Sequence, residues 1–155
     1  MSIRPTTLAF RVITIGLTAA FVYQQLAGLR TLPFTIGSAS HNVAVVFVFW
    51  LNMLQGGFCI SALWVATTVF ERLSRGEAFN ASVAKGLRGI GLNLVLSTIA
   101  AILVVPNLKP VLLGTDWSPA IAADVESVTI GMIGLVLYLV ARQGTVMKAE
   151  LESFV

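Results

Sequence analysis

The feature that most constrains this chain is the segment from Val43 to Phe70, which contains no charged residue. At roughly 28 residues it is longer than the roughly 20 that an α-helix needs to cross the hydrocarbon core of a bilayer. The composition agrees, because 57% of the 155 residues are hydrophobic and only 11% are charged, whereas soluble domains have about 25% charged residues. We therefore expect an integral membrane protein.

Three further apolar segments are long enough to span the membrane. Pro106 and Pro110 are expected to close the third of them. Asp124 and Glu126 stand in the first turns of the fourth, where a helix dipole favours acidic side chains. The sequence thus predicts an all-α, single-domain protein, a four-helix transmembrane bundle. Its expected spans are about 8–29, 43–70, 87–105 and 120–141, joined by a polar loop 71–88 and followed by a tail 142–155 whose helicity stays open.

Lys and Arg residues are distributed unevenly between the two sides of this arrangement. Of the ten, all but Arg30 and Lys109 fall on the side of the termini and of the loop 71–88. Basic residues accumulate on the cytoplasmic side of membrane proteins. The distribution therefore predicts that both termini and this loop are cytoplasmic.

Residue types that support catalysis or metal binding are scarce. His41 is the only histidine and Cys59 the only cysteine, whereas a general base beside a nucleophile or a metal centre requires several such groups. We expect no enzymatic activity, cofactor or metal site. Direct nucleic-acid binding is not expected either, because the basic residues flank apolar segments and do not line one polar face. For His41, an interfacial residue without a special role is favoured over a pH sensor.

Polar side chains inside the predicted spans are few. Asn52 and Gln55 in the second span and Asn93 in the third are candidates for hydrogen bonds between helices. The alternative is a polar pathway for a solute, which the absence of ionisable groups from the middle of each span disfavours. Small residues recur at a spacing typical of helix contacts in three pairs: Gly16 with Ala20, Gly57 with Ser61, and Ser97 with Ala101.

The loop 71–88 combines charge, polarity and glycine. Gly76 divides it, and Asn80 is the expected N-cap of the helix that follows. A solvated hairpin that only enforces topology remains an alternative to a binding role. Candidate contacts for a cytoplasmic partner or for anionic lipid head groups are Arg72, Arg75, Lys85 and Arg88.

The segment VFERLSRGEAFNASVAKGLRGIG, from Val69 to Gly91, resembles the signature of domain of unknown function 2975. In that family a helix ends in a charged turn, followed by Gly-x-x-Phe and by a helix that opens with Leu-Arg and Ile-Gly. The tail ARQGTVMKAELESFV lacks the acidic-Leu-Thr-Val ending that is usual in the family. The resemblance implies a bacterial membrane protein with four spans, often encoded beside a small helix-turn-helix regulator. The matching residues are Phe70, Gly76, Phe79, Leu87, Arg88, Ile90 and Gly91.

These features predict a bacterial inner-membrane protein with a regulatory or accessory role. It would contact membrane lipids and bind a cytoplasmic partner, such as a helix-turn-helix regulator, through residues 71–88. Two alternatives stay open. One is a small transporter or channel subunit, whose pore would form near Asn52, Gln55 and Asn93 in a homo-oligomer. The other is a structural subunit that joins other membrane subunits in a larger complex.

Overall fold

The computed structural model describes residues 5–35, 38–75, 81–116, 118–122 and 124–153. Within these ranges the chain consists of helices and connecting segments, without a β-strand. Four helical rods are long and apolar enough to cross a membrane, which confirms the predicted all-helical chain with four candidate spans. The elements are α1 (Pro5–Arg30), α2 (Ala39–Ser74), α3 (Ala81–Ile99), a π-helical turn η1 (Ala100–Val104), α4 (Val105–Leu113) and α5 (Val125–Ser153).

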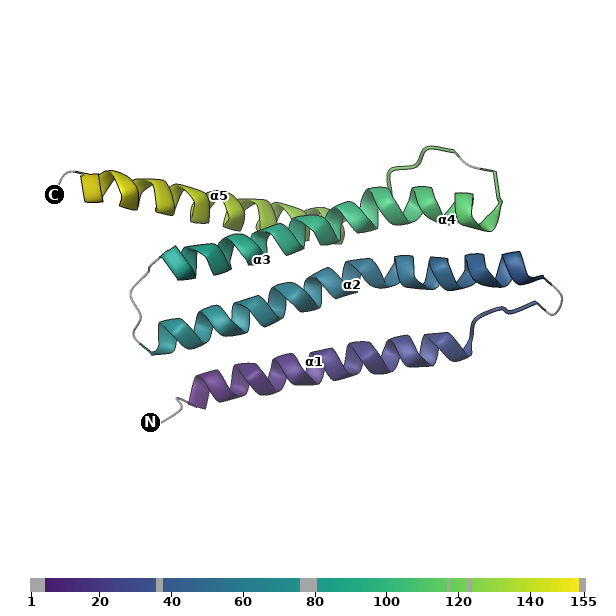
Figure 1. Ribbon diagram of the computed structural model, residues 1–155, viewed down its shortest axis with the longest axis horizontal. Helices are drawn as coiled ribbons and strands as arrows, with labels where there is room; N and C mark the ends of the chain where they lie inside the picture. The colour runs from purple at the N-terminus through teal and green to yellow at the C-terminus, as the bar shows by residue number, and fades with distance from the viewer. Residues whose placement is uncertain (1–4, 36–37, 76–80, 117, 123, 154–155) are drawn as a thin grey trace.

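The four rods lie side by side in an open row, in the order α1, α2, α3 and α5 (Figure 1). Each packs against its neighbour in the row, and α2 also runs alongside α4. No extensive contact joins α1 to α3 or α5 in the described part of the chain. In the described part of the chain, the predicted four helices are therefore arranged as an open row. Such an open row is compatible with a membrane, because acyl chains are as apolar as the side chains and can replace a missing helix neighbour.

Glycines bring the backbones of α3 and α5 close together. A Cβ on Gly91 would lie 2.5 Å from the carbonyl oxygen of Gly134, and a Cβ on Gly134 would lie 2.7 Å from the Cβ of Leu94. Nearby, Thr98 Oγ1 donates a hydrogen bond of 2.8 Å to the carbonyl oxygen of Ser127. Small residues at an interface let two backbones approach closely, which strengthens packing in lipid.

Gly91→Ala is expected to destabilise the protein, because the added methyl group has no room beside α5. Overpacking of this kind costs about 1–3 kcal/mol. Thermal unfolding in detergent micelles measures the effect. Gly57→Ala is the matched control, since a Cβ there meets no atom within 4 Å, and it should leave the melting temperature unchanged or slightly raised. Equal melting of the two variants would contradict the glycine contact.

The helix that contains α3 does not end at its prolines. Pro106 has no N–H to donate to the carbonyl oxygen of Ile102, four residues earlier. That oxygen instead accepts a hydrogen bond of 3.2 Å from the backbone N–H of Ala122. The helix passes through the π-helical turn, tolerates Pro110, and stops at its C-cap Gly114, which has a left-handed φ of 65°. The predicted end of the third span at the prolines is thus corrected.

Two asparagines each hold a connecting segment through a pair of hydrogen bonds to one backbone residue. The two segments precede α2 and α5. Asn107 accepts a hydrogen bond from the backbone N–H of Ala120 at 3.1 Å and donates one to its carbonyl oxygen at 2.8 Å. Asn42 accepts from the N–H of Thr35 at 2.9 Å and donates to its carbonyl oxygen at 3.1 Å. A side-chain amide carries both a donor and an acceptor. Each asparagine therefore satisfies both backbone groups of one loop residue.

Asn107→Leu is expected to release the segment before α5. Both hydrogen bonds to Ala120 are lost, at about 0.5–1.5 kcal/mol each, together with the one that Asn107 Nδ2 donates to the carbonyl oxygen of Leu103. The amide of Ala120 should therefore exchange faster with solvent deuterium. Asn42→Leu is the control, because it should accelerate exchange at Thr35 and leave Ala120 protected. Hydrogen–deuterium exchange followed by mass spectrometry distinguishes the segments. If the amide of Ala120 stayed as protected in Asn107→Leu as in wild type, Asn107 would not hold the segment before α5.

The fourth long helix begins later and ends later than predicted. Asp124 caps it, because its carboxylate accepts hydrogen bonds from the backbone N–H and from the hydroxyl of Ser127. The helix starts at Val125 and continues to Ser153, so most of the polar tail is helical. The expected cap at Asn80 lies outside the described residues.

Candidate functional site

Most of the described basic side chains gather at one end of the row, which we call the charged end. There α1 begins, α2 ends, α3 begins and α5 continues beyond its neighbours (left in Figure 1). The opposite end carries Arg30 and Lys109 as its described basic residues. Described charged side chains of the charged end are Arg11, Glu71, Arg72, Arg75, Lys85, Arg88 and Arg142.

An ion pair ties α1 to α2 at the charged end. Arg11 Nε lies 2.6 Å from Glu71 Oε1, and the side chain of Glu71 is only 19% exposed. Directly beside it, the rings of Phe10 and Phe70 stack at a centroid distance of 4.8 Å. Glu71 is the single acidic side chain described at this end. Its charge is therefore already neutralised by Arg11.

Three of the four predicted binding residues remain without such a partner. Arg72, Arg75 and Lys85 are exposed. Within the described part of the chain, none of the three side chains forms an ion pair or a hydrogen bond. Arg72 and Arg75 lie at the end of α2, and Lys85 lies in the first turns of α3. Their positive charge is available to an external ligand.

The fourth predicted binding residue, Arg88, contacts α5. Its Nη2 donates a hydrogen bond of 3.0 Å to the hydroxyl oxygen of Tyr138, and its guanidinium carbon lies 5.0 Å from the centroid of the same ring. A cation above an aromatic face is attracted by the ring quadrupole. Arg88 therefore links two helices, in addition to carrying charge.

Tyr138→Phe is expected to cost about 0.5–1.5 kcal/mol, because it removes the hydrogen bond and keeps the ring. Tyr138→Leu should cost about 0.5–1 kcal/mol more, since the cation–π contact is lost as well. Thermal unfolding in detergent measures the effect: the melting temperature should be lower for Tyr138→Leu than for Tyr138→Phe. Tyr23→Phe serves as the control, because Tyr23 is 75% exposed on α1. A wild-type melting temperature for Tyr138→Leu would show that the link contributes nothing.

The three predicted intramembrane polar residues do not join helices through their side chains. Asn93 Nδ2 donates a hydrogen bond of 2.9 Å to the carbonyl oxygen of Gly89, within its own helix. Asn52 is exposed, and its side chain forms no hydrogen bond in the described part. Gln55 takes part only through its backbone carbonyl oxygen, which accepts from Ser97 Oγ at 3.0 Å. The expectation of interhelical bonds from these amides was wrong.

Hydroxyl groups supply the interhelical hydrogen bonds instead. The Oγ1 atoms of Thr14 and Thr67 lie 2.9 Å apart, and these residues are 0% and 3% exposed. One turn further along α1, Thr18 Oγ1 accepts a hydrogen bond of 3.1 Å from Trp64 Nε1. These threonines are not among the residues predicted from the sequence. A usable signal existed, because Thr14 and Thr18 share one face of an apolar helix at a spacing of four residues.

A groove of about 410 Å³ runs along α2 between its two neighbours. Phe21 of α1 and Asn93 of α3 form its walls, and α2 forms its floor between Trp50 and Ser61. Gly57 lies in this floor with open space above it. The predicted helix contact at Gly57 and Ser61 is thus not made within the chain.

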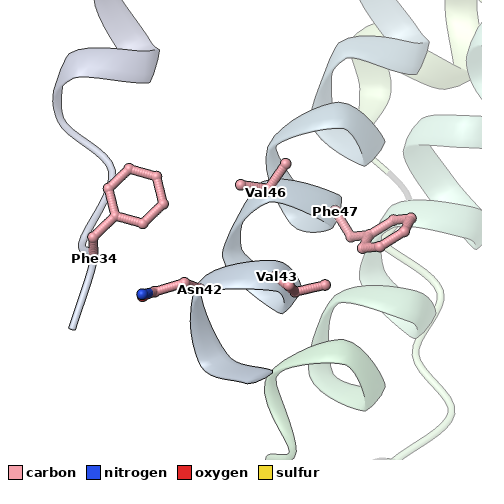
Figure 2. Close-up of a pocket in the computed structure, with 5 residues that line it drawn as sticks. All are labelled: Phe34, Asn42, Val43, Val46 and Phe47. Carbon is pink, nitrogen blue, oxygen red and sulfur yellow. The ribbon is translucent and has the colours of Figure 1, made fainter. Parts of the chain in front are cut away.

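A second groove, of about 250 Å³, lies at the opposite end of the row (Figure 2). Phe34 of the connecting segment lines it together with Val43, Val46 and Phe47 of α2. In Figure 2, Phe34 lies on the side of α2 toward which Val46 points, whereas Val43 and Phe47 point to the other side. Asn42 is its one polar lining residue, and the amide of Asn42 is already bonded to the connecting segment. The lining of this groove is mainly apolar and contains no titratable side chain.

Residues able to hold a metal ion do not cluster in the described part of the chain, where no three His, Cys, Asp or Glu side chains come together. His41 is exposed in the first turn of α2. Cys59 Sγ lies 3.1 Å from Ser97 Oγ, between α2 and α3.

Four helical rods long and apolar enough to cross a membrane indicate a multi-pass membrane protein. The chain belongs to the family described as protein of unknown function DUF2975, whose family model matches residues 13–155. No curated protein and no solved structure matches it.

The residues that carry the family resemblance occupy helix contacts. Phe70 stacks against α1, and both Arg88 and Gly91 contact α5. Gly76 and Phe79 of the same signature lie outside the described residues. The described part of the signature therefore helps to set how α1, α2, α3 and α5 pack beside the charged end.

Proposed function

We propose that this protein is a regulatory or accessory protein of the bacterial inner membrane that captures an acidic cytoplasmic partner at its charged end. The observation that carries the proposal is the set of three exposed cations, Arg72, Arg75 and Lys85, which lack an acidic partner in the described part of the chain. Complementary charge steers association and selects the partner.

The charge distribution supports a cytoplasmic position for this end. Lys and Arg concentrate there, whereas Arg30 and Lys109 are the basic residues of the opposite end. By the positive-inside rule, this distribution favours a cytoplasmic position for both termini and for residues 71–88. A partner that is soluble in the cytoplasm would meet the exposed cations directly.

The interior of the row supports a scaffold in preference to a transporter or channel. The run from Val43 to Phe70 carries no charge, and ionisable groups inside the membrane usually mark a transport path. The amide of Asn93 is bonded within its own helix, although it borders the groove. A role as structural subunit of a larger complex would use the exposed apolar faces of the row instead.

A small helix-turn-helix regulator with an acidic surface is the partner that we propose. The family resemblance supports this choice, because such regulators are often encoded beside its members. We expect Arg88 to contribute less to binding this partner, because its guanidinium group already contacts Tyr138. The contact then depends chiefly on Arg72, Arg75 and Lys85.

Pull-down of the neighbouring regulator tests the proposal. Replacing Arg72, Arg75 and Lys85 by Gln together should lower recovery about tenfold, because three exposed ion pairs contribute about 0.5 kcal/mol each. The control replaces Arg30 and Lys109 by Gln and should leave recovery unchanged. Absence of regulator from the wild-type pull-down, or equal recovery by the triple variant, would refute the proposed function.

A further inference from the structure

One exposed stripe on α2 leads from the groove to the charged end. Ser61, Trp64, Thr68, Arg72 and Arg75 follow one another at spacings of three or four residues, and all are exposed. Such spacing places them on one face of the helix. We call this set the α2 stripe. It begins at the groove and ends at two cations.

Lys85 of α3 lies on the same broad face of the row. Lys85, Gly89 and Asn93 are four residues apart and therefore share one side of α3. A Cβ on Gly89 would lie 3.6 Å from Val65 of α2, and Asn93 borders the groove. Lys85 thus lies at the charged end of this side of α3. There it is a third cation beside Arg72 and Arg75 of the α2 stripe.

The length of the α2 stripe matches one leaflet of a bilayer. At about 1.5 Å per residue, Arg72 lies about 16 Å from Ser61 along the axis of α2. Half of the hydrocarbon core is about 15 Å thick. A lipid whose phosphate lies at Arg72 would therefore have the end of its acyl chain at Ser61, where the apolar groove of about 410 Å³ begins.

We infer that this face binds an anionic phospholipid of the leaflet at the charged end. Arg72, Arg75 and Lys85 hold the phosphate group, and an acyl chain runs past Thr68 and Trp64 into the start of the groove. Charge complementarity selects the head group, because the three cations have no acidic partner among the described side chains. Below the cations, the exposed face of α2 leads to the groove, so a lipid can place its head group at the cations and an acyl chain along α2.

The lipid site does not rest on the proposed function, although both use the same cations. A partner with an acidic surface would compete with lipid phosphate for Arg72, Arg75 and Lys85. The lipid composition of the membrane would then regulate access of the partner to the charged end.

Native mass spectrometry of the full chain in detergent micelles, titrated with defined lipids, tests the inference. Dioleoyl phosphatidylglycerol should bind about tenfold or more tightly than dioleoyl phosphatidylcholine. Replacing Arg72, Arg75 and Lys85 by Gln should abolish this preference. Ser61→Leu should weaken binding of the dioleoyl lipid severalfold and spare dilauroyl phosphatidylglycerol, whose shorter chains stop before the groove.

Gly16→Leu is the matched control for Ser61→Leu, because it adds the same side chain on α1 where a Cβ meets no atom within 4 Å. It should bind both phosphatidylglycerols like wild type. Equal binding of the two dioleoyl lipids by the wild type would overturn the site. The proposed path of the acyl chain would be overturned if Ser61→Leu bound dioleoyl phosphatidylglycerol as well as wild type does. It would also be overturned if Gly16→Leu lost this binding to the same extent as Ser61→Leu. Ser61→Leu should leave recovery of the regulator unchanged, so the two proposals fail separately.

Discussion

The close approach of α3 to α5 at Gly91 and Gly134 is the contact on which the rest of the row depends. In lipid, apolar surface gives little drive for helices to associate, because acyl chains solvate it as well as another helix does. Backbones that meet without intervening side chains gain packing that lipid cannot supply. Thr98 and Arg88 add hydrogen bonds from α3 to α5 on either side of these glycines. Together these contacts join α3 to α5.

The other pair of helices, α1 and α2, is joined by polar contacts. Thr14 bonds to Thr67, and Arg11 pairs with Glu71, so α1 is held to α2 by groups that lipid cannot satisfy. This ion pair uses the one acidic side chain described at the charged end, so no described carboxylate there pairs with Arg72, Arg75 or Lys85.

The sequence predicted which basic residues belong to the candidate site. It did not predict which of them contacts another helix. Basic residues around 71–88 stand out in the sequence because they interrupt long uncharged runs. The four candidate cations look alike there. Contact with Tyr138, fifty residues away, separates Arg88 from Arg72 and Lys85. A pairing at that distance along the chain has no local pattern from which it could be inferred.

The sequence by itself determined the number of candidate spans, the all-helical class and the ends at which charge gathers, because apolar length and charge are properties of consecutive residues. The tertiary structure alone decided that the helices form an open row. It also decided that the helix continues past Pro106, because the carbonyl oxygen freed on Ile102 is satisfied by Ala122 from a distant segment. Which glycines pack closely was likewise settled by neighbours, since Gly57 and Gly91 look equivalent until the facing helix is known.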